Sequence, residues 1–165
     1  MAVPDKIKTY LSESAVSYWH KTHPVAFTSQ ETAAVDHISG QELGKTVVLL
    51  ADGRPIMAVL PADRVINMDV LKKHVGCERL SLASEREFPE RFPSCQPGAM
   101  PPFGRLFGMM LYCDRSLAAQ PEVEFNAGTH VDTIRMKFSE FAQLEAPVMA
   151  DFSEKATGKP LVRAA

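Results

Sequence analysis

The chain has 165 residues, a length typical of one domain, and its formal charge is −2, from 18 Lys and Arg against 20 Asp and Glu. Together with a hydrophobic fraction of 45%, this composition excludes a disordered chain, a collagen-like repeat and a coiled coil. The charge also lacks the basic surplus with which proteins hold long stretches of nucleic acid.

The sequence contains no apolar run long enough for a membrane span and no apolar N-terminal region of the kind found in signal peptides. We therefore expect a cytoplasmic protein without a membrane partner. We also expect a single domain over residues 1–152, followed by a loosely held polar tail over 153–165.

Helix periodicity and capping signals predict several short helices. They are expected over residues 5–14, 29–37, 40–43, 68–75 and 139–144. Asn67 is expected to cap the fourth of these helices and Gly76 to end it. Gly44 is expected to stop the third helix in the left-handed conformation. A further capping box at Ser84 predicts a helix that Pro89 shortens or kinks.

Apolar alternation and β-branched residues predict strands along much of the chain. They are expected over residues 16–20, 46–51, 55–60, 78–82, 107–113, 122–126, 133–137 and 147–151. The second and third of these strands flank Asp52-Gly53, the strongest hairpin signal in the sequence. Because short strands and helices are interspersed without a regular βαβ alternation, we expect an α+β fold around a mixed, curved sheet or barrel flanked by helices.

The three cysteines, Cys77, Cys95 and Cys113, show no CxxC or other zinc-site spacing, and we interpret them as reduced thiols rather than metal ligands or nucleophiles. His20 and His23 form at most a weak metal pair, because no HExxH helix accompanies them. The sequence also lacks a nucleotide-binding glycine loop and a GxSxG elbow. We expect neither a metal ion nor another cofactor.

Three segments of the sequence are candidates for chemistry. Lys45 precedes an apolar strand, the segment 98–104 (GAMPPFG) lies in a long proline-rich loop, and the segment 125–132 places Gly, Thr and His between two strands. Each also has a purely structural interpretation. Lys45 is then a solvated charge at the end of a strand, the segment 98–104 a rigid surface turn, and the segment 125–132 a tight hairpin. As a functional set, backbone amides of the two glycine-bearing loops would polarise a carbonyl group while the lysine holds a phosphate.

The chain resembles the YbaK family of aminoacyl-tRNA deacylases in the order and spacing of three features. They are Lys45 with the strand that follows it, the segment 98–104 and the segment 126–130 (NAGTH). That family includes the editing domain inserted in bacterial prolyl-tRNA synthetases. The resemblance extends over about residues 20–150 and includes the segments 23–28 and 82–85.

The resemblance implies a mixed β-sheet or barrel flanked by helices, and a hydrolase that removes amino acids from mischarged tRNA. It implies that Lys45 holds the phosphate of the acceptor end and that backbone groups of the two loops position the ester. The residues that we carry over as catalytic are Lys45, Gly104 and His130. The residues that we carry over as substrate-binding are His23, Thr28, Gly98, Pro102, Phe103, Gly128, Thr129 and Asp132.

An aminoacyl ester is activated, so a water molecule positioned by backbone donors and assisted by the neighbouring ribose hydroxyl suffices without a triad or a metal. Residues 99–101 (AMP) replace the small hydroxyl-bearing residues of the family members that hydrolyse cysteinyl-tRNA. The resemblance therefore does not identify the amino acid that is removed. The expected partners are the acceptor end of mischarged tRNA and, as a candidate, an aminoacyl-tRNA synthetase, with no DNA partner. The alternatives are a non-catalytic module that binds aminoacyl-tRNA or a synthetase, and a hydrolase of another aminoacyl ester.

Overall fold

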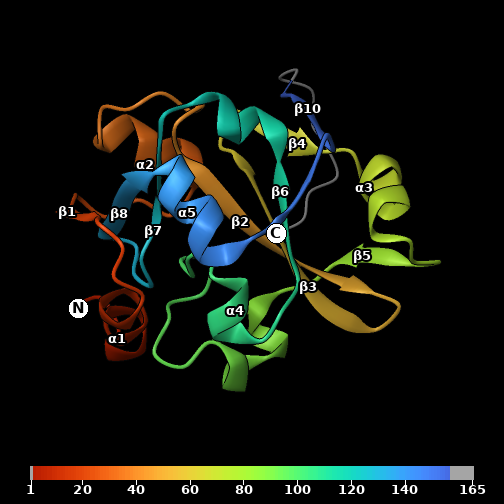
Figure 1. The fold of residues 1–165 in the computed structure, drawn as a ribbon, viewed down its shortest axis with the longest axis horizontal. Coiled ribbons are helices and arrows are strands. Elements are labelled where there is room, and N and C mark those ends of the chain that lie inside the picture. Colours follow the sequence, from red (N-terminus) through yellow and green to blue (C-terminus); the bar gives the residue numbers. More distant parts are fainter. Residues whose placement is uncertain (1, 157–165) are drawn as a thin grey trace.

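The computed structural model describes residues 2–156, in which short helices and strands are interspersed along the chain (Figure 1). The α-helices are α1 (Asp5–Glu13), α2 (Ser29–Val35), α3 (Met68–Val75), α4 (Gly104–Phe107) and α5 (Phe138–Glu145). The strands are β1 (Trp19–Thr22), β2 (Gly44–Ala51), β3 (Arg54–Pro61), β4 (Arg64–Ile66), β5 (Leu80–Leu82), β6 (Leu111–Asp114), β7 (Glu122–Asn126), β8 (Asp132–Lys137), β9 (Val148–Ala150) and β10 (Ser153–Lys155). This mixture confirms the expected α+β class. No helix in the described part of the chain combines the length and the apolar composition needed to cross a membrane.

The strands form one mixed sheet and two smaller antiparallel sheets. In the five-stranded sheet the order is β5-β2-β3-β6-β9, with β2 antiparallel to β5 and β3, and β6 parallel to β3 and β9. The three-stranded sheet has the order β1-β8-β7, and β10 pairs with β4. An isolated parallel bridge between Leu43 and Glu124 joins the residue before β2 to β7. This bridge connects the five-stranded sheet with the three-stranded sheet.

The central strands β2 and β3 are buried on both faces, which explains why their sequences are nearly continuous apolar runs. The paired residues Val48 and Met57 belong to a core cluster that also contains Phe125 of β7 and side chains of α1 and α5. The neighbouring Leu49 faces the other way and packs in a second cluster with Leu71 of α3. The five-stranded sheet therefore lies between two hydrophobic layers.

Two elements form where local sequence signals predict them. Asp52 and Gly53 have φ angles of 49° and 83°, the left-handed values that a tight hairpin turn between β2 and β3 requires. Oδ1 of Asn67 accepts a hydrogen bond from the amide of Val70 at 3.2 Å and so caps α3. Gly76 ends the same helix with a φ of 76°. The predicted hairpin and the predicted helix are confirmed.

Other predictions for the first half of the chain differ from the structure. The expected helix over 40–43 is absent, and Gly44 begins β2 instead of stopping a helix. A Cβ atom at Gly44 would lie 3.1 Å from Cγ2 of Val59 and 3.5 Å from Cγ2 of Val123. A side chain at this position would therefore be tight against Val59 of β3 and in ordinary contact with Val123 of β7. The strand expected over residues 16–20 begins only at Trp19 and continues to Thr22, as β1.

Two predictions for the second half are also wrong in part. The capping box before Glu85–Glu87 opens a 3₁₀ turn, and a second one follows at Pro89–Arg91, where an α-helix was expected. The strand expected over 107–113 begins only at Leu111. Gly108 explains the delay, because its φ of 71° ends α4 in the left-handed conformation.

The expected tail is ordered at its beginning. Ser153 to Lys155 form β10, and Nε of Arg64 in β4 donates a hydrogen bond to Oγ of Ser153 at 2.6 Å. Oδ1 of the buried Asp114 accepts hydrogen bonds from the amides of Phe152 and Ser153, both at 2.9 Å. Paired structure therefore continues past the boundary expected at residue 152. The rest of the predicted tail, residues 157–165, lies outside the described residues.

Candidate functional site

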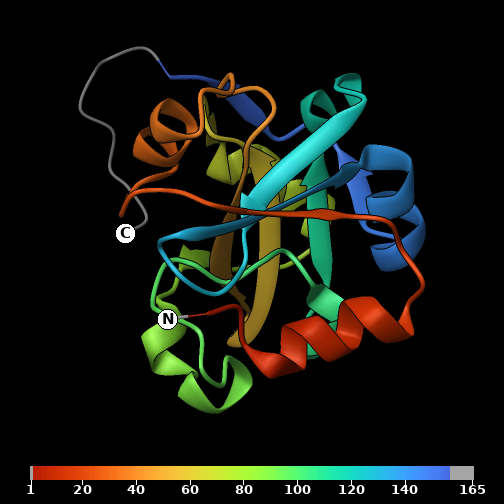
Figure 2. The same cartoon turned by 90° about the vertical axis from the view of Figure 1, so that its left-hand side faces the viewer.

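An extended segment between β1 and α2 continues the pairing of β1 with β8 toward the loop that joins β7 to β8 (Figure 2). The amide of His23 donates a hydrogen bond to the carbonyl of Val131 at 2.8 Å. The amide of Ala26 donates to the carbonyl of His130 at 3.2 Å. The segment 23–28 therefore lies beside the loop 127–131, although the two are far apart in the sequence.

The loop 127–131 is also fixed to the beginning of the loop 96–104. The amide of Gly128 donates to the carbonyl of Ala99 at 2.7 Å, and the amide of Gln96 donates to the carbonyl of Gly128 at 2.8 Å. Oε1 of Gln96 accepts a hydrogen bond from the amide of His130 at 2.8 Å. The structure thus brings together the two glycine-bearing loops that the sequence singled out.

His130 lies where these three segments meet. Its ring is buried, with 8% of the residue exposed, and Nε2 lies 2.8 Å from the carbonyl oxygen of Pro97. Because a carbonyl oxygen can only accept a hydrogen bond, Nε2 carries the proton, and in the neutral ring Nδ1 keeps a lone pair. Nδ1 is buried and has no hydrogen-bond partner among the described residues. His130 therefore offers an unused acceptor at the junction of the loops.

A buried hydrogen-bonded group at the start of β8 holds the loop 127–131 in shape. Oγ1 of Thr129 donates to Oδ2 of Asp132 at 2.6 Å and accepts from the amide of Val131 at 3.2 Å. Nε2 of His20 lies 2.6 Å from Oδ1 of Asp132. Burial raises the pKa of Asp132, but the hydrogen bonds from Thr129 and His20 outweigh burial and leave this pKa below its usual value. The side chains of Thr129 and Asp132 thus support the loop.

The loop 96–104 exposes its beginning and buries its end. Gly98 is exposed and has a φ of 83°, whereas Pro102 is buried. The ring of Phe103 is fully buried, and its centroid lies 5.3 Å from the ring centroids of both Tyr10 and Phe125. Gly98 can therefore approach a ligand, while Phe103 belongs to the hydrophobic core.

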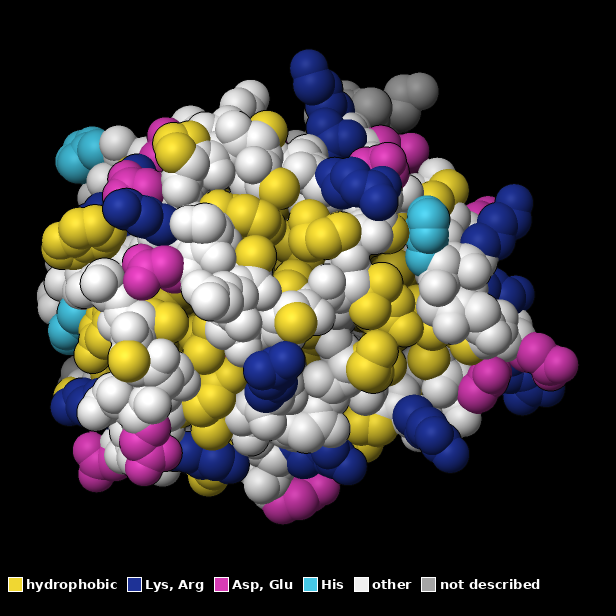
Figure 3. All heavy atoms as spheres, viewed as in Figure 1, with side chains coloured by type: hydrophobic (Ala, Val, Ile, Leu, Met, Phe, Trp, Pro, Cys, Tyr) yellow, Lys and Arg dark blue, Asp and Glu magenta, His cyan; other side chains and the backbone are white. Residues whose placement is uncertain are grey.

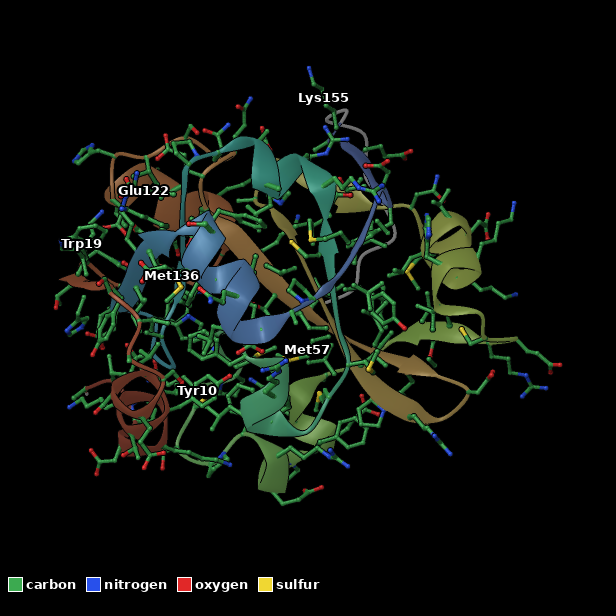
Figure 4. The ribbon with its side chains drawn as sticks, in the orientation of Figure 1. Tyr10, Trp19, Met57, Glu122, Met136 and Lys155 are labelled. Carbon is green, nitrogen blue, oxygen red and sulfur yellow. The ribbon has the colours of Figure 1, made fainter. Side chains whose placement is uncertain are left out.

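Gly104 begins α4, and the amide of the next residue, Arg105, donates to Oε1 of the buried Glu145 at 3.2 Å. The hydroxyl of Tyr10, which lies between α1 and α5 (Figure 4), donates to Oε2 of Glu145 at 2.5 Å. A Cβ atom at Gly104 would lie 2.5 Å from the carbonyl oxygen of Met109. Gly104 therefore allows a close backbone approach, and its sequence-based role as a donor to the ester stays a prediction.

Gly128 likewise has a structural role. Its φ is 95°, and a Cβ atom there would lie 2.6 Å from Cδ of Pro4. Its amide is already bonded to Ala99, so it does not provide the expected donor. The amide of the next residue, Thr129, is the candidate donor of this loop, and the residue itself is fully buried.

Thr28 caps α2, as its capping-box pattern predicts. Oγ1 of Thr28 accepts from the amide of Glu31 at 3.1 Å, and the Glu31 carboxylate accepts from the amide of Phe27 at 3.0 Å. The Thr28 hydroxyl is therefore committed to the helix. Nδ1 of His23 lies 2.6 Å from the carbonyl oxygen of Pro24, and Nε2 is buried with no hydrogen-bond partner within the described chain. His23 thus keeps a buried acceptor next to the site.

Lys45 is half-buried at the second position of β2, opposite Leu60 of β3. The bridge between Leu43 and Glu124 is parallel, so the chain advances in the same direction on both strands. Lys45 lies two residues beyond Leu43, and Asn126, the last residue of β7, lies two residues beyond Glu124. This register places Lys45 at the level where β7 leads into the loop 127–131.

A buried charged cluster next to the site has no signal in the sequence. Nζ of Lys21 lies 3.0 Å from Oε1 of Glu124 and 3.7 Å from Oδ1 of Asp36, and the two acidic side chains are 0% and 4% exposed. Burial, and then the adjacent Asp36, raise the pKa of Glu124 to about 7. Burial also raises the pKa of Asp36, but Glu124 and Lys21 outweigh it and lower this pKa. The three residues come from different elements, so no local pattern reveals the cluster.

Cys95 directly precedes Gln96 of the site, whereas Cys113 lies in β6. Burial raises the pKa of the Cys113 thiol to about 12, which disfavours the thiolate that a nucleophile needs. Within residues 2–156, no three His, Cys, Asp or Glu side chains are grouped to hold a metal ion. A depression of about 600 Å³ is lined by residues 118–122 and 137–139, and one of about 440 Å³ by residues of the β2–β3 hairpin and 78–81. Neither depression is lined by a site residue predicted from the sequence.

Comparison with protein families gives a match over most of the chain. The model of the family described as the aminoacyl-tRNA editing domain matches residues 23–144. The matched range contains all the residues that the sequence analysis carried over as catalytic or substrate-binding.

Two relatives connect the chain with tRNA. The multifunctional Ser/Thr-tRNA deacylase ProXp-y of Escherichia coli K12 is 31% identical over 131 residues, which cover 74% of this chain and 78% of the relative. The proline–tRNA ligase of Geotalea daltonii is 29% identical over 135 residues, which cover 81% of this chain and 23% of the ligase. The chain therefore corresponds to a segment of the ligase and to most of the deacylase.

Solved structures share the fold. The hypothetical protein APE2540 superimposes with a TM-score of 0.80 at 24% identity, over 90% of this chain and 99% of that chain. A candidate trans-editing enzyme for prolyl-tRNA synthetase superimposes with a TM-score of 0.78 at 20% identity, over 91% of this chain and 96% of that chain. At these identities the likeness concerns the fold.

Proposed function

The chain belongs to the aminoacyl-tRNA editing domain family, and we propose that it hydrolyses the ester bond of mischarged aminoacyl-tRNA. The observation that carries this proposal is the pair of interlocked loops, 96–104 and 127–131, with the unpartnered Nδ1 of His130 at their junction. Such a junction offers fixed hydrogen-bonding groups to a substrate that needs no strong nucleophile.

Hydrolysis forms a bond between a water oxygen and the ester carbonyl carbon and breaks the bond from that carbon to the ribose oxygen, which takes up the proton that the water loses. Nδ1 of His130 accepts a hydrogen bond from this water and orients it, because Nε2 is committed to the carbonyl of Pro97. The amide of Thr129 donates to the carbonyl oxygen as that oxygen becomes negative in the transition state. The neighbouring ribose hydroxyl activates the ester further, so these two groups suffice.

Lys45 holds a phosphate of the acceptor end in this account. Its ammonium group is a compact charge with three donors on a flexible stem, which suits a single phosphate. The partner is therefore the 3′ end of a mischarged tRNA. An aminoacyl-tRNA synthetase is proposed as a second partner because the Geotalea daltonii ligase contains a related segment.

The test is single-turnover deacylation of a panel of correctly charged and mischarged tRNAs by the wild type and by His130→Gln. The amide nitrogen of Gln reaches the position of the ring Nε2 and keeps a donor for the carbonyl of Pro97, but it removes the acceptor at Nδ1. We expect the wild type to deacylate at least one mischarged tRNA, and His130→Gln to be slower by about 10²-fold or more, with an unchanged thermal melt. Tight binding of the panel without hydrolysis by the wild type would favour a non-catalytic module and contradict the proposal.

A further inference from the structure

Phe27 and Val25 expose apolar side chains directly beside the candidate site. Their exposed fractions are 69% and 60%, whereas Ala26 between them is 2% exposed and its amide is bonded to the carbonyl of His130. Side chains of an extended segment alternate between its two faces. Phe27 and Val25 therefore both expose their side chains, while Ala26 between them is turned inward.

The ring of Phe27 contacts the ring of His130. The two centroids lie 5.0 Å apart, with an angle of 54° between the ring planes. The backbone of Phe27 is fixed as well, because its amide donates to Oε2 of Glu31 at 3.0 Å within the cap of α2. A ring on a fixed backbone loses little conformational freedom when a ligand covers it. Phe27 is therefore a preorganised apolar surface at the edge of the site.

We propose that Phe27, with Val25 beside it, is the surface on which the base of the terminal nucleotide of aminoacyl-tRNA stacks. This inference rests on the proposed function, because it takes the reacting ester to lie at His130. The ester and the base are attached to the same ribose, so the surface that binds the base must lie within one nucleoside of the reacting groups. The contact between the rings of Phe27 and His130 meets this condition.

Stacking on an aromatic side chain suits this position for a second reason. Every base has a π face, so an aromatic ring binds the end of any tRNA without reading its sequence. The other exposed large apolar side chains of the described residues belong to other parts of the fold: Tyr18 directly precedes β1, Trp19 lies on the outer side of β1 (Figure 4), Met110 follows α4, and Val148 lies on β9. Trp19, with 51% exposure, therefore serves as the matched control for an exposed aromatic ring.

The test is a binding cycle with a hairpin RNA that carries a tRNA acceptor stem and a single-stranded 3′ end. The RNA is prepared either with a terminal adenosine or with an abasic terminal residue, and it is left uncharged so that affinity is measured without hydrolysis. Phe27→Ala is expected to weaken binding of the adenosine-ended RNA by about tenfold and binding of the abasic RNA by less than about twofold. Phe27→Tyr and the control Trp19→Ala are expected to bind both RNAs like the wild type.

Equal losses with the two RNAs, or no loss with either, would overturn the inference. Normal binding by Phe27→Ala, combined with a loss of hydrolysis that depends on the attached amino acid, would place the ring against that amino acid and would overturn it too. Coupling between Phe27 and the terminal base in a protein that does not deacylate would support the stacking surface and contradict the proposed function alone.

Discussion

Glu124 holds a carboxyl group that is fully buried beside the carboxyl group of Asp36. Lys21 lies 3.0 Å from Glu124, and Nη1 of Arg135 in β8 lies 3.6 Å from it, so two cations face two acids. Burial and the adjacent Asp36 raise the pKa of Glu124 to about 7 despite these cations. The folded protein therefore binds a proton at pH values where the unfolded chain has released it.

We expect this cluster to make the free energy of unfolding fall as the pH rises from about 5 to about 8. The contribution of Glu124 is fully present below its unfolded pKa and is lost as the pH rises through the folded pKa near 7. The replacement Glu124→Gln mimics the protonated form of the side chain. The free energy of unfolding of this variant should therefore not decline over this pH range, and at pH 8 it should exceed that of the wild type by on the order of 2 kcal/mol. Urea unfolding at several pH values measures the free energy of unfolding of the wild type and of the variant. Parallel pH profiles of the two proteins would show that Glu124 stays ionised in the fold.

At the scale of elements, the site depends on the contact between the loops 96–104 and 127–131. Gln96 is central to this contact, because its side chain accepts from the amide of His130 and its amide donates to Gly128. Its side chain therefore acts as a positioning group for His130 rather than as a catalytic one.

We expect Gln96→Ala to lower the single-turnover rate by about tenfold while leaving the affinity for uncharged tRNA nearly unchanged, because it releases the amide of His130 and loosens the ring. Asn67→Ala is the matched control: it removes the cap of α3, away from the loops, and costs about 1 kcal/mol of stability without changing the rate of the folded protein. The role of Gln96 would be refuted by a variant that keeps the wild-type rate, or by a control that loses as much activity as Gln96→Ala.

The elements that the sequence predicted correctly are those whose determinants are local. The β2–β3 hairpin needs Asp52-Gly53, and α3 needs Asn67 and Gly76, so neighbouring residues decide both. The start of β2 at Gly44 and the pairing of β10 depend instead on partners distant in the chain. No periodicity or capping signal contains that information.

The candidate site follows the same division. The sequence identified the segments that meet, because the motifs are local, but it misjudged what individual residues do. Gly128 looks like a donor in isolation, yet the carbonyl of Ala99 takes its amide through a tertiary contact. The cluster of Lys21, Asp36 and Glu124 was missed for the same reason.

At the scale of the whole molecule, charge limits how the protein holds tRNA. The formal charge is −2, and on the face shown in Figure 3 Lys and Arg side chains are interspersed with Asp and Glu. A protein of this kind neutralises few phosphates, so binding should be weak and confined to the acceptor end.

We expect a plot of log affinity against log salt concentration to have a slope of about −1 to −2, as for one to three phosphate contacts on a single strand. Fluorescence anisotropy with tRNA and with an acceptor-stem hairpin measures it, and the two RNAs should give similar slopes. A slope steeper than about −5 would indicate an extended basic interface and contradict the small footprint.

The proposed contact between Lys45 and a phosphate of the acceptor end is the feature on which the proposed site depends most directly. The measurement is single-turnover hydrolysis of a mischarged tRNA that the wild type deacylates, together with thermal melts, for the wild type, Lys45→Ala, Lys45→Met, Lys45→Arg and the exposed control Lys155→Ala. Loss of one charge-assisted phosphate contact should slow Lys45→Ala and Lys45→Met by on the order of a hundredfold. Lys45→Arg should recover part of the rate, because its planar fork places the donors elsewhere, and Lys155→Ala should match the wild type. Wild-type hydrolysis by folded Lys45→Ala and Lys45→Met would show that Lys45 does not hold the substrate and would contradict the site.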